Sequence, residues 1–337
     1  MIKISDIEPI DRKSKYKKVA NLETDYLGRL RINTKPEDKL EELIKKKKRS
    51  KTKKSARELA ALIYLKKEFP NSLILGTPKD LYQIIRTFHK RSWQSLVYKN
   101  KKSTTFGKQI LEVFGYSKRF RSQVKRGIWL AEQLNIKVCP YCNAQSTIVA
   151  SATSGKKIAK FQFDHFFSKD QYPYLSISLY NLIPSCANCN ITKSYKNLDL
   201  VNYYNPYFSD FSIYFKFHLK YNPDPKKLNI SQVSKQNLEI ELVAKHPDPN
   251  HMVSKHNDLY HLKGVYNRHQ DIAEDLLVKA IIYTNGLISG HLKIKGLFPD
   301  RSTYLRYLIS AYPDSKDLLK RPLTKFTQDI AKQLKLY

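Results

Sequence analysis

Between residues 55 and 90, apolar side chains recur every three or four positions, which predicts two amphipathic helices. The first is expected to begin at Ser55, because Ser55-Ala56-Arg57-Glu58 fits a capping box, and to end before Pro70. The second is expected to begin at Thr77-Pro78-Lys79-Asp80 and to place Leu81, Ile84, Ile85 and Phe88 on its buried face. These apolar positions indicate a helical core.

Helical periodicity returns near the C-terminus. From about residue 256, apolar positions predict one long helix that ends at Asn285-Gly286. Two shorter helices are expected near 302–311 and 322–335.

Alternating patterns predict strands in the middle of the chain. Residues 145–151 resemble a strand, 153–156 a turn, and 160–163 a returning strand, so we expect a hairpin. Polar and apolar residues also alternate over 211–217 and 238–242. Strands or an extended connector would both fit the stretch 201–255.

The net charge indicates what the chain binds. There are 61 Lys and Arg residues against 30 Asp and Glu, which gives +31. Nucleic acid is the usual partner of so basic a chain, since each neutralised phosphate releases counterions. A merely basic surface or an anionic membrane patch are the alternatives. The excess is concentrated in residues 1–138. There the run Lys45–Lys51 predicts either a solvated, mobile arm or one that grips phosphates.

The compartment is expected to be cytoplasmic. No stretch approaches the roughly 18–20 apolar residues of a membrane span, and the N-terminus lacks the layout of a signal peptide. We therefore expect no membrane partner.

The four cysteines form two C-x-x-C pairs, Cys139/Cys142 and Cys186/Cys189. Two such pairs predict one tetrahedral Zn²⁺ site. Because protein thiolates would fill every position on the ion, its role would be structural. Four reduced core cysteines or a redox pair are the alternatives.

Between the two pairs lie Phe163-Asp164-His165-Phe166 and Tyr180-Asn181-Leu182, and the second pair leads into Asn190-Ile191-Thr192-Lys193. In this order the motifs resemble the HNH endonucleases, whose pattern is an Asp-His step, a later Asn-Leu, and C-x-x-C-[His or Asn]-x-x-Lys at the head of a helix. The resemblance covers residues 139–193.

The resemblance implies a ββα-metal fold that grips one divalent ion. Asp164 and Asn190 would bind a catalytic Mg²⁺ or Mn²⁺, and His165 would be the general base that activates water. Asn181 would hold the loop, and Lys193 would lie near a phosphate. Asn190 stands where other members have histidine, which favours a hard ion.

The chemistry of these residue types agrees with those roles. A histidine with a pKa near 6.5 suits proton abstraction at neutral pH, and a hard cation stabilises charge on a phosphate. Neighbouring residues on a strand point to opposite faces, so Asp164 and His165 can share one site only if the strand twists or ends there. Asn190 and Lys193, three residues apart, would share one helical face.

We therefore predict an α+β, mostly helical chain. A basic helical region (1–135) would precede a ββα-metal nuclease core with zinc knuckles (136–200), followed by a connector and C-terminal helices (201–337). The predicted function is metal-dependent hydrolysis of phosphodiester bonds, in DNA first of all. A non-catalytic, zinc-stabilised nucleic-acid-binding protein and a ribonuclease are the alternatives.

A finer resemblance concerns biological role. Cys139-Pro140-Tyr141-Cys142, Leu179–Cys186 and the Arg321–Lys325 tail are similar to HNH subunits of bacterial anti-phage systems of the Septu type. That resemblance implies a defence complex with an ATPase partner.

Overall fold

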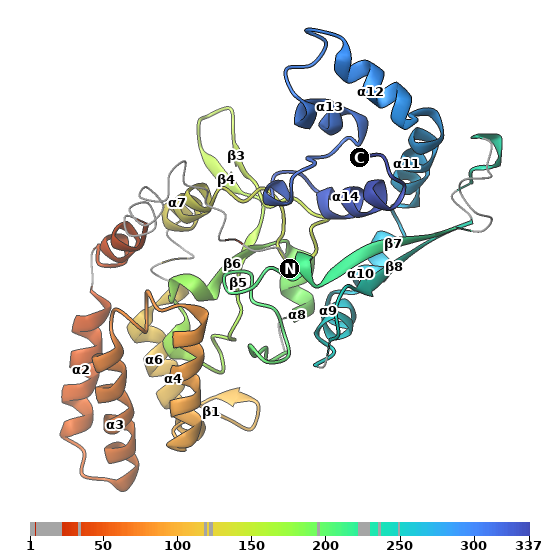
Figure 1. The fold of residues 1–337 in the computed structure, drawn as a ribbon. Coiled ribbons are helices and arrows are strands. Elements are labelled where there is room, and N and C mark those ends of the chain that lie inside the picture. Colours follow the sequence, from red (N-terminus) through yellow and green to blue (C-terminus); the bar gives the residue numbers. More distant parts are fainter. Residues whose placement is uncertain are drawn as a thin grey trace. The chain divides into compact units, whose positions relative to one another are not determined.

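The computed structural model describes residues 4, 22–32, 35–117, 120, 124–193, 196–221, 230–234, 237–248 and 250–337. Within them the chain is α+β, about half helical, with small antiparallel sheets (Figure 1). It divides into two compact units. We call Ile4–Asn135 with Val149–Phe208 the N-terminal unit, and Ile136–Ile148 with Ser209–Tyr337 the C-terminal unit. The segment 136–200, expected to form one nuclease core, is thus divided between the two.

The N-terminal unit opens with helices. Residues 22–30 are helical, and the helices after them are α2 (Pro36–Lys48), α3 (Lys53–Glu68), α4 (Pro78–Lys90), α5 (Gln94–Val97), α6 (Thr105–Phe114) and α7 (Val124–Leu134). One interpretation of the basic run at 45–51 was a mobile arm. In the structure these residues form the last turn of α2 and the start of the loop to α3.

Local capping signals fix two of these helices. The predicted start of α4 at Thr77-Pro78 and its buried apolar face are confirmed, and the structure adds a capping box formed by Thr77 and Asp80. The prediction for α3 was wrong at its start: Thr52 is the N-cap and accepts a bond from the Ser55 amide. Ser55 lies inside the helix and donates its hydroxyl to the Lys47 carbonyl oxygen.

Short strands complete the N-terminal unit. They are β1 (Tyr98–Lys99), β2 (Lys102–Ser103), β3 (Val149–Ser151), β4 (Lys157–Ala159), β5 (Gln162–His165) and β6 (Leu182–Ser185), followed by helix α8 (Ala187–Lys193). The expected hairpin forms between β3 and β4, with Gly155 at a positive φ in its turn. Its predicted second strand was displaced, because 162–165 pairs with β6 instead.

The loop between β5 and β6 is tied to the helices of the same unit. It contains the 3-10 turns η2 (Pro173–Leu175) and η3 (Leu179–Asn181). The ring of Tyr174 stacks on Phe88 of α4 with centroids 4.1 Å apart. The Leu179 amide donates to the Ile74 carbonyl oxygen at 2.8 Å, and the Tyr26 hydroxyl donates to the Ile177 carbonyl oxygen at 2.8 Å. The helices therefore fix the backbone that follows Asp164 and His165.

The C-terminal unit combines one hairpin with helices. Its elements are η4 (Phe211–Ile213), β7 (Phe215–Tyr221), η6 (Ile230–Gln232), β8 (Leu238–Ala244), α9 (Met252–Tyr260), α10 (Leu262–Tyr266), α11 (Gln270–Ile282), α12 (Asn285–Lys293), α13 (Arg301–Leu308), η8 (Ser315–Asp317) and α14 (Thr324–Gln333). The alternation over 211–217 and 238–242 corresponds to the paired strands β7 and β8, except that 211–213 forms the 3-10 turn η4. The two last helices are confirmed. The single long helix was wrong: it breaks at His261, which has a positive φ, and Asn285 begins a helix.

Side chains bond the outward-facing backbone of one residue on each strand of the β7–β8 hairpin. The side-chain amide of Gln333 in α14 bonds both the amide and the carbonyl oxygen of Leu219 on β7. The side-chain amide of Asn267 does the same for Ile240 on β8. Because unpaired backbone groups at a strand edge cost free energy when buried, these bonds contribute to the stability of the two-stranded sheet.

Candidate functional site

A strand pair and a helix bring the predicted residues together in the N-terminal unit. Strands β5 and β6 are antiparallel, with Asp164 opposite Ile183 and His165 opposite Leu182. Helix α8 follows β6 and carries Asn190 and Lys193. Asp164 and His165 can share one site only if the strand twists or ends there, and strand β5 does end at His165. Both residues line one cavity.

The imidazole of His165 is buried and neutral. Its Nε2 lies 2.9 Å from the Ser176 carbonyl oxygen, and the Tyr116 ring meets it edge-on at 4.4 Å. Burial lowers the pKa of His165 to about 3, with help from the charge of Lys169. Because a carbonyl oxygen only accepts, Nε2 carries the proton and Nδ1 keeps its lone pair. Nδ1 is therefore the acceptor atom of the ring, and the same burial that keeps the ring neutral makes it a weak base at neutral pH.

Asp164 is paired with an internal cation. The ammonium of Lys193 donates to Asp164 Oδ1 at 3.0 Å and also to the His165 carbonyl oxygen. Both side chains are almost fully buried. Burial lowers the pKa of Lys193, while the Asp164 carboxylate opposes this shift. Lys193 was expected beside a phosphate; it lines the cavity, but its charge is directed at Asp164.

Asn190 is half-buried on α8, and its side-chain Nδ2 donates to Gln162 Oε1 on β5. This leaves Oδ1 as the Asn190 atom suited to a cation. Asp164 and Asn190 offer the carboxylate and amide oxygens that Mg²⁺ or Mn²⁺ prefers. The Lys193 ammonium pairs with the Asp164 carboxylate, so a divalent ion would have to displace it to bind there.

Asn181 is architectural. Its Oδ1 accepts from the Phe167 amide at 2.7 Å, and its Nδ2 donates to the carbonyl oxygens of Phe167 and Leu175, both at 3.0 Å. The side chain is fully buried. It closes the loop that carries Ser176, and thereby fixes the acceptor of His165 Nε2.

The cavity beside these residues has a volume of about 660 Å³. Rings of Tyr116, Phe120 and Phe163 form part of its wall. Its charged lining residues are Lys156, Lys157, Asp164, Lys169, Asp170 and Lys193. Lys157 is paired with Glu132 and Lys193 with Asp164, which leaves Lys156 and Lys169 against Asp170 and a small positive excess at the cavity.

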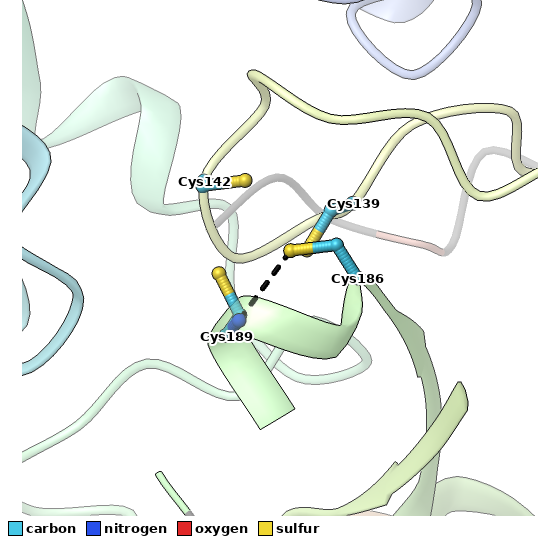
Figure 2. Close-up of side chains that lie close together, drawn as sticks. All are labelled: Cys139, Cys142, Cys186 and Cys189. Carbon is cyan, nitrogen blue, oxygen red and sulfur yellow. Dashed lines mark hydrogen bonds between the residues drawn. The ribbon is translucent and has the colours of Figure 1, made fainter. Parts of the chain in front are cut away.

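The four cysteines form the second candidate site (Figure 2). Their Sγ atoms all lie within 4.8 Å of one another, the side chains are buried, and none is in a disulfide. A tetrahedral zinc site with Zn–S bonds of ~2.3 Å has sulfur–sulfur edges of roughly 3.8 Å, so modest adjustment would seat the ion. The Cys189 amide donates to Cys186 Sγ at 3.4 Å, and the Ala144 amide donates to Cys142 Sγ at 3.5 Å. Such amides stabilise thiolates. The cluster could thus bind a metal such as zinc.

The C-terminal unit braces the first pair of cysteines. The Tyr266 hydroxyl donates to the Cys142 carbonyl oxygen at 2.7 Å. Asn143, at a positive φ of 53°, donates to the Leu318 carbonyl oxygen and accepts from the Lys325 amide. These bonds fix the knuckle backbone, as metal sites generally require.

Sequence reasoning thus identified residues that the fold brings to one cavity: Asp164, His165, Asn190 and Lys193. It missed Ser176 and Tyr116, which set the state of His165. A backbone carbonyl carries no sequence signal, and Tyr116 lies far along the chain. Gln162, the partner of Asn190, sits two residues before Asp164 and could have been noticed there.

Comparison with protein families, with curated proteins and with solved structures found no match to this chain. Among the described residues, no helix is both long and apolar enough to cross a bilayer.

Proposed function

We propose that the chain is a metal-dependent endonuclease of the HNH type that hydrolyses phosphodiester bonds, with DNA as the expected substrate. The observation that carries the proposal is His165 beside Asp164. Its neutral ring lines a lysine-rich cavity, and its Nε2–H is held by a backbone carbonyl, which leaves Nδ1 as a base.

In this reaction His165 Nδ1 takes a proton from a water molecule while the water oxygen bonds to phosphorus. The bond from phosphorus to one sugar oxygen breaks, and that oxygen takes a proton from solvent. Lys156 and Lys169 at the cavity offer charges to the flanking phosphates. Asp164 and Asn190 would hold a divalent cation, which supplies stabilisation of the developing negative charge.

Two features of the chain maintain the base. Asn181 holds the loop whose Ser176 carbonyl fixes the ring, and burial keeps the imidazole unprotonated while it also lowers its basicity, which binding of an anionic phosphate beside the ring would raise. The cysteine cluster would support α8 through a structural zinc ion, since Cys186 and Cys189 lie at the start of that helix.

The test is cleavage of supercoiled plasmid by purified protein with Mg²⁺ or Mn²⁺, beside His165→Ala. His246→Ala is the matched control, because His246 is exposed and remote in sequence from the site. We expect metal-dependent nicking by the wild type and the control, and none by His165→Ala. Cleavage by His165→Ala at the wild-type rate would refute the proposal. An RNA substrate in parallel separates the ribonuclease alternative.

One observation favours a second candidate, a non-catalytic nucleic-acid-binding protein. The Asp164 carboxylate already has a buried cationic partner in Lys193, so the pair can be explained as structural. DNA binding without cleavage in any metal, by protein that retains its zinc, would favour this function.

A further inference from the structure

The loop between α2 and α3 carries the densest charge in the described part of the chain. Residues 45–54, here called the basic tip, read Lys-Lys-Lys-Lys-Arg-Ser-Lys-Thr-Lys-Lys. Eight of these ten residues are basic, and none is acidic or apolar. The tip joins two helices that pack side by side (Figure 1).

Folding explains only part of this sequence. Lys47 has a structural role, because its ammonium pairs with the buried carboxylate of Glu58 and lies 5.1 Å from the centre of the Phe106 ring. Lys45, Lys46 and Lys48 are exposed in the last turn of α2, where a helix dipole favours positive charge.

The remaining basic residues oppose the helix dipole. Lys53 and Lys54 occupy the first turn of α3, which holds no acidic residue. Cations are unfavourable at a helix N-terminus, and mutual repulsion with Arg49 and Lys51 adds to this cost. All of these side chains are exposed. A stable fold does not need them, so they indicate an anionic partner.

We propose that the basic tip is a docking surface for the phosphate backbone of nucleic acid. Seven exposed cations at one end of the packed helix pair α2–α3 match a polyanion whose duplex carries one charge per ~1.7 Å. The tip lacks apolar and aromatic side chains, which membrane-surface segments insert between lipids, so a bilayer is the poorer fit. The proposal shares a nucleic-acid partner with the proposed function, but binding is measured without cleavage.

The test compares two variants of equal net charge. The tip variant changes Lys45, Lys46, Arg49 and Lys51 to Gln. The control variant changes Lys293, Lys295, Arg301 and Lys335 to Gln, which are exposed residues of the C-terminal unit. Circular dichroism verifies the fold of both. Binding to a fluorescein-labelled DNA duplex is measured by anisotropy over a range of salt, without added Mg²⁺ or Mn²⁺.

For the tip variant, the slope of log affinity against log salt should fall by about 3 to 4, because each phosphate contact contributes ~0.9. The control slope should change by less than about 1. Equal changes in the two variants would mean that only overall charge matters, and would overturn the proposal. So would loss of binding to phosphatidylserine–phosphatidylcholine vesicles in the tip variant with DNA binding unchanged.

The outcome is independent of the nuclease assay. If the tip variant alone loses DNA binding while wild-type protein never cleaves, docking stands and the nuclease proposal falls. If cleavage depends on His165 while the tip variant binds DNA like the control, the nuclease stands and docking falls.

Discussion

The buried pair of Asp164 and Lys193 allows a sharp test of the site by a double-mutant cycle. Asp164→Asn leaves the ammonium of Lys193 buried without its carboxylate partner. Lys193→Met leaves the carboxylate of Asp164 buried without its ammonium partner. Breaking a buried pair from one side costs about 3–5 kcal/mol, whereas replacing both partners is often nearly neutral. Lys193 also donates to the His165 carbonyl oxygen, so the double variant should still lose about 1 kcal/mol.

The two single changes would then sum to about 6–10 kcal/mol, and the double variant should lose far less. The assay is urea denaturation followed by tryptophan fluorescence. Both tryptophans, Trp93 and Trp129, lie in the N-terminal unit, so the signal reports the unit that holds the pair. A double variant whose loss equals the sum within about 0.5 kcal/mol would refute the ion pair.

The same variants test competition between Lys193 and a metal ion. If the ammonium occupies the cation position at Asp164, Lys193→Met should bind Mn²⁺ at least about tenfold more tightly, or 1.4 kcal/mol. The double variant, which lacks the carboxylate, should not share this gain. Isothermal titration calorimetry measures both affinities. Equal Mn²⁺ affinity in Lys193→Met and wild type would show that the ammonium does not compete.

Three further predictions follow from burial and bonding elsewhere. Purified chain should hold one zinc ion, measured by inductively coupled plasma mass spectrometry, and Cys186→Ser should lower this content; wild-type protein without metal would contradict the assignment. Asn181→Ala should cost about 3–5 kcal/mol by tryptophan fluorescence, because it removes three buried hydrogen bonds, those to the Phe167 amide, the Phe167 carbonyl oxygen and the Leu175 carbonyl oxygen; a loss below about 1 kcal/mol would contradict its architectural role. Burial lowers the pKa of Lys325 to about 8, so between pH 8 and roughly 10.4 the unfolded chain holds a proton that the folded chain lacks. Stability should therefore rise across that window relative to Lys325→Met, by about 3 kcal/mol at most, in hydrogen exchange of peptides from 209–337; a parallel pH dependence of the two proteins would contradict the shift.

Local signals were the part of the fold that the sequence could predict. The helix start at Thr77-Pro78 and the stop at Pro70 depend on neighbours within four residues, and the start of α4 and the end of α3 follow from such contacts. The partner of β5 was missed because it lies beyond a loop and contains Pro184, which argues against a strand. Helix α9 ends at His261, which has a positive φ, and no glycine or proline at that position indicates the helix end in the sequence.

For the candidate site too, the sequence predicted the features that depend on near neighbours and missed those that depend on distant contacts. Spacing alone anticipated that the four cysteines would cluster, since each C-x-x-C places two thiolates together. The order of motifs selected Asp164 and His165. It gave no information on their electrostatic state, which burial, a backbone carbonyl and Lys193 determine.

The first cysteine pair shows why spacing identifies ligands without explaining their rigidity. Residues 139–146 form too short a segment to provide hydrogen-bond partners for all of their own backbone groups. Several of their carbonyl oxygens accept hydrogen bonds from residues far away in the sequence. Tyr266 donates to that of Cys142, and the Leu323 amide donates to that of Asn143. Lys325 in turn binds the Asn143 side chain through its own amide. These donors come more than a hundred residues later, so the geometry of the first cysteine pair depends on distant residues of the same unit that its spacing does not reveal.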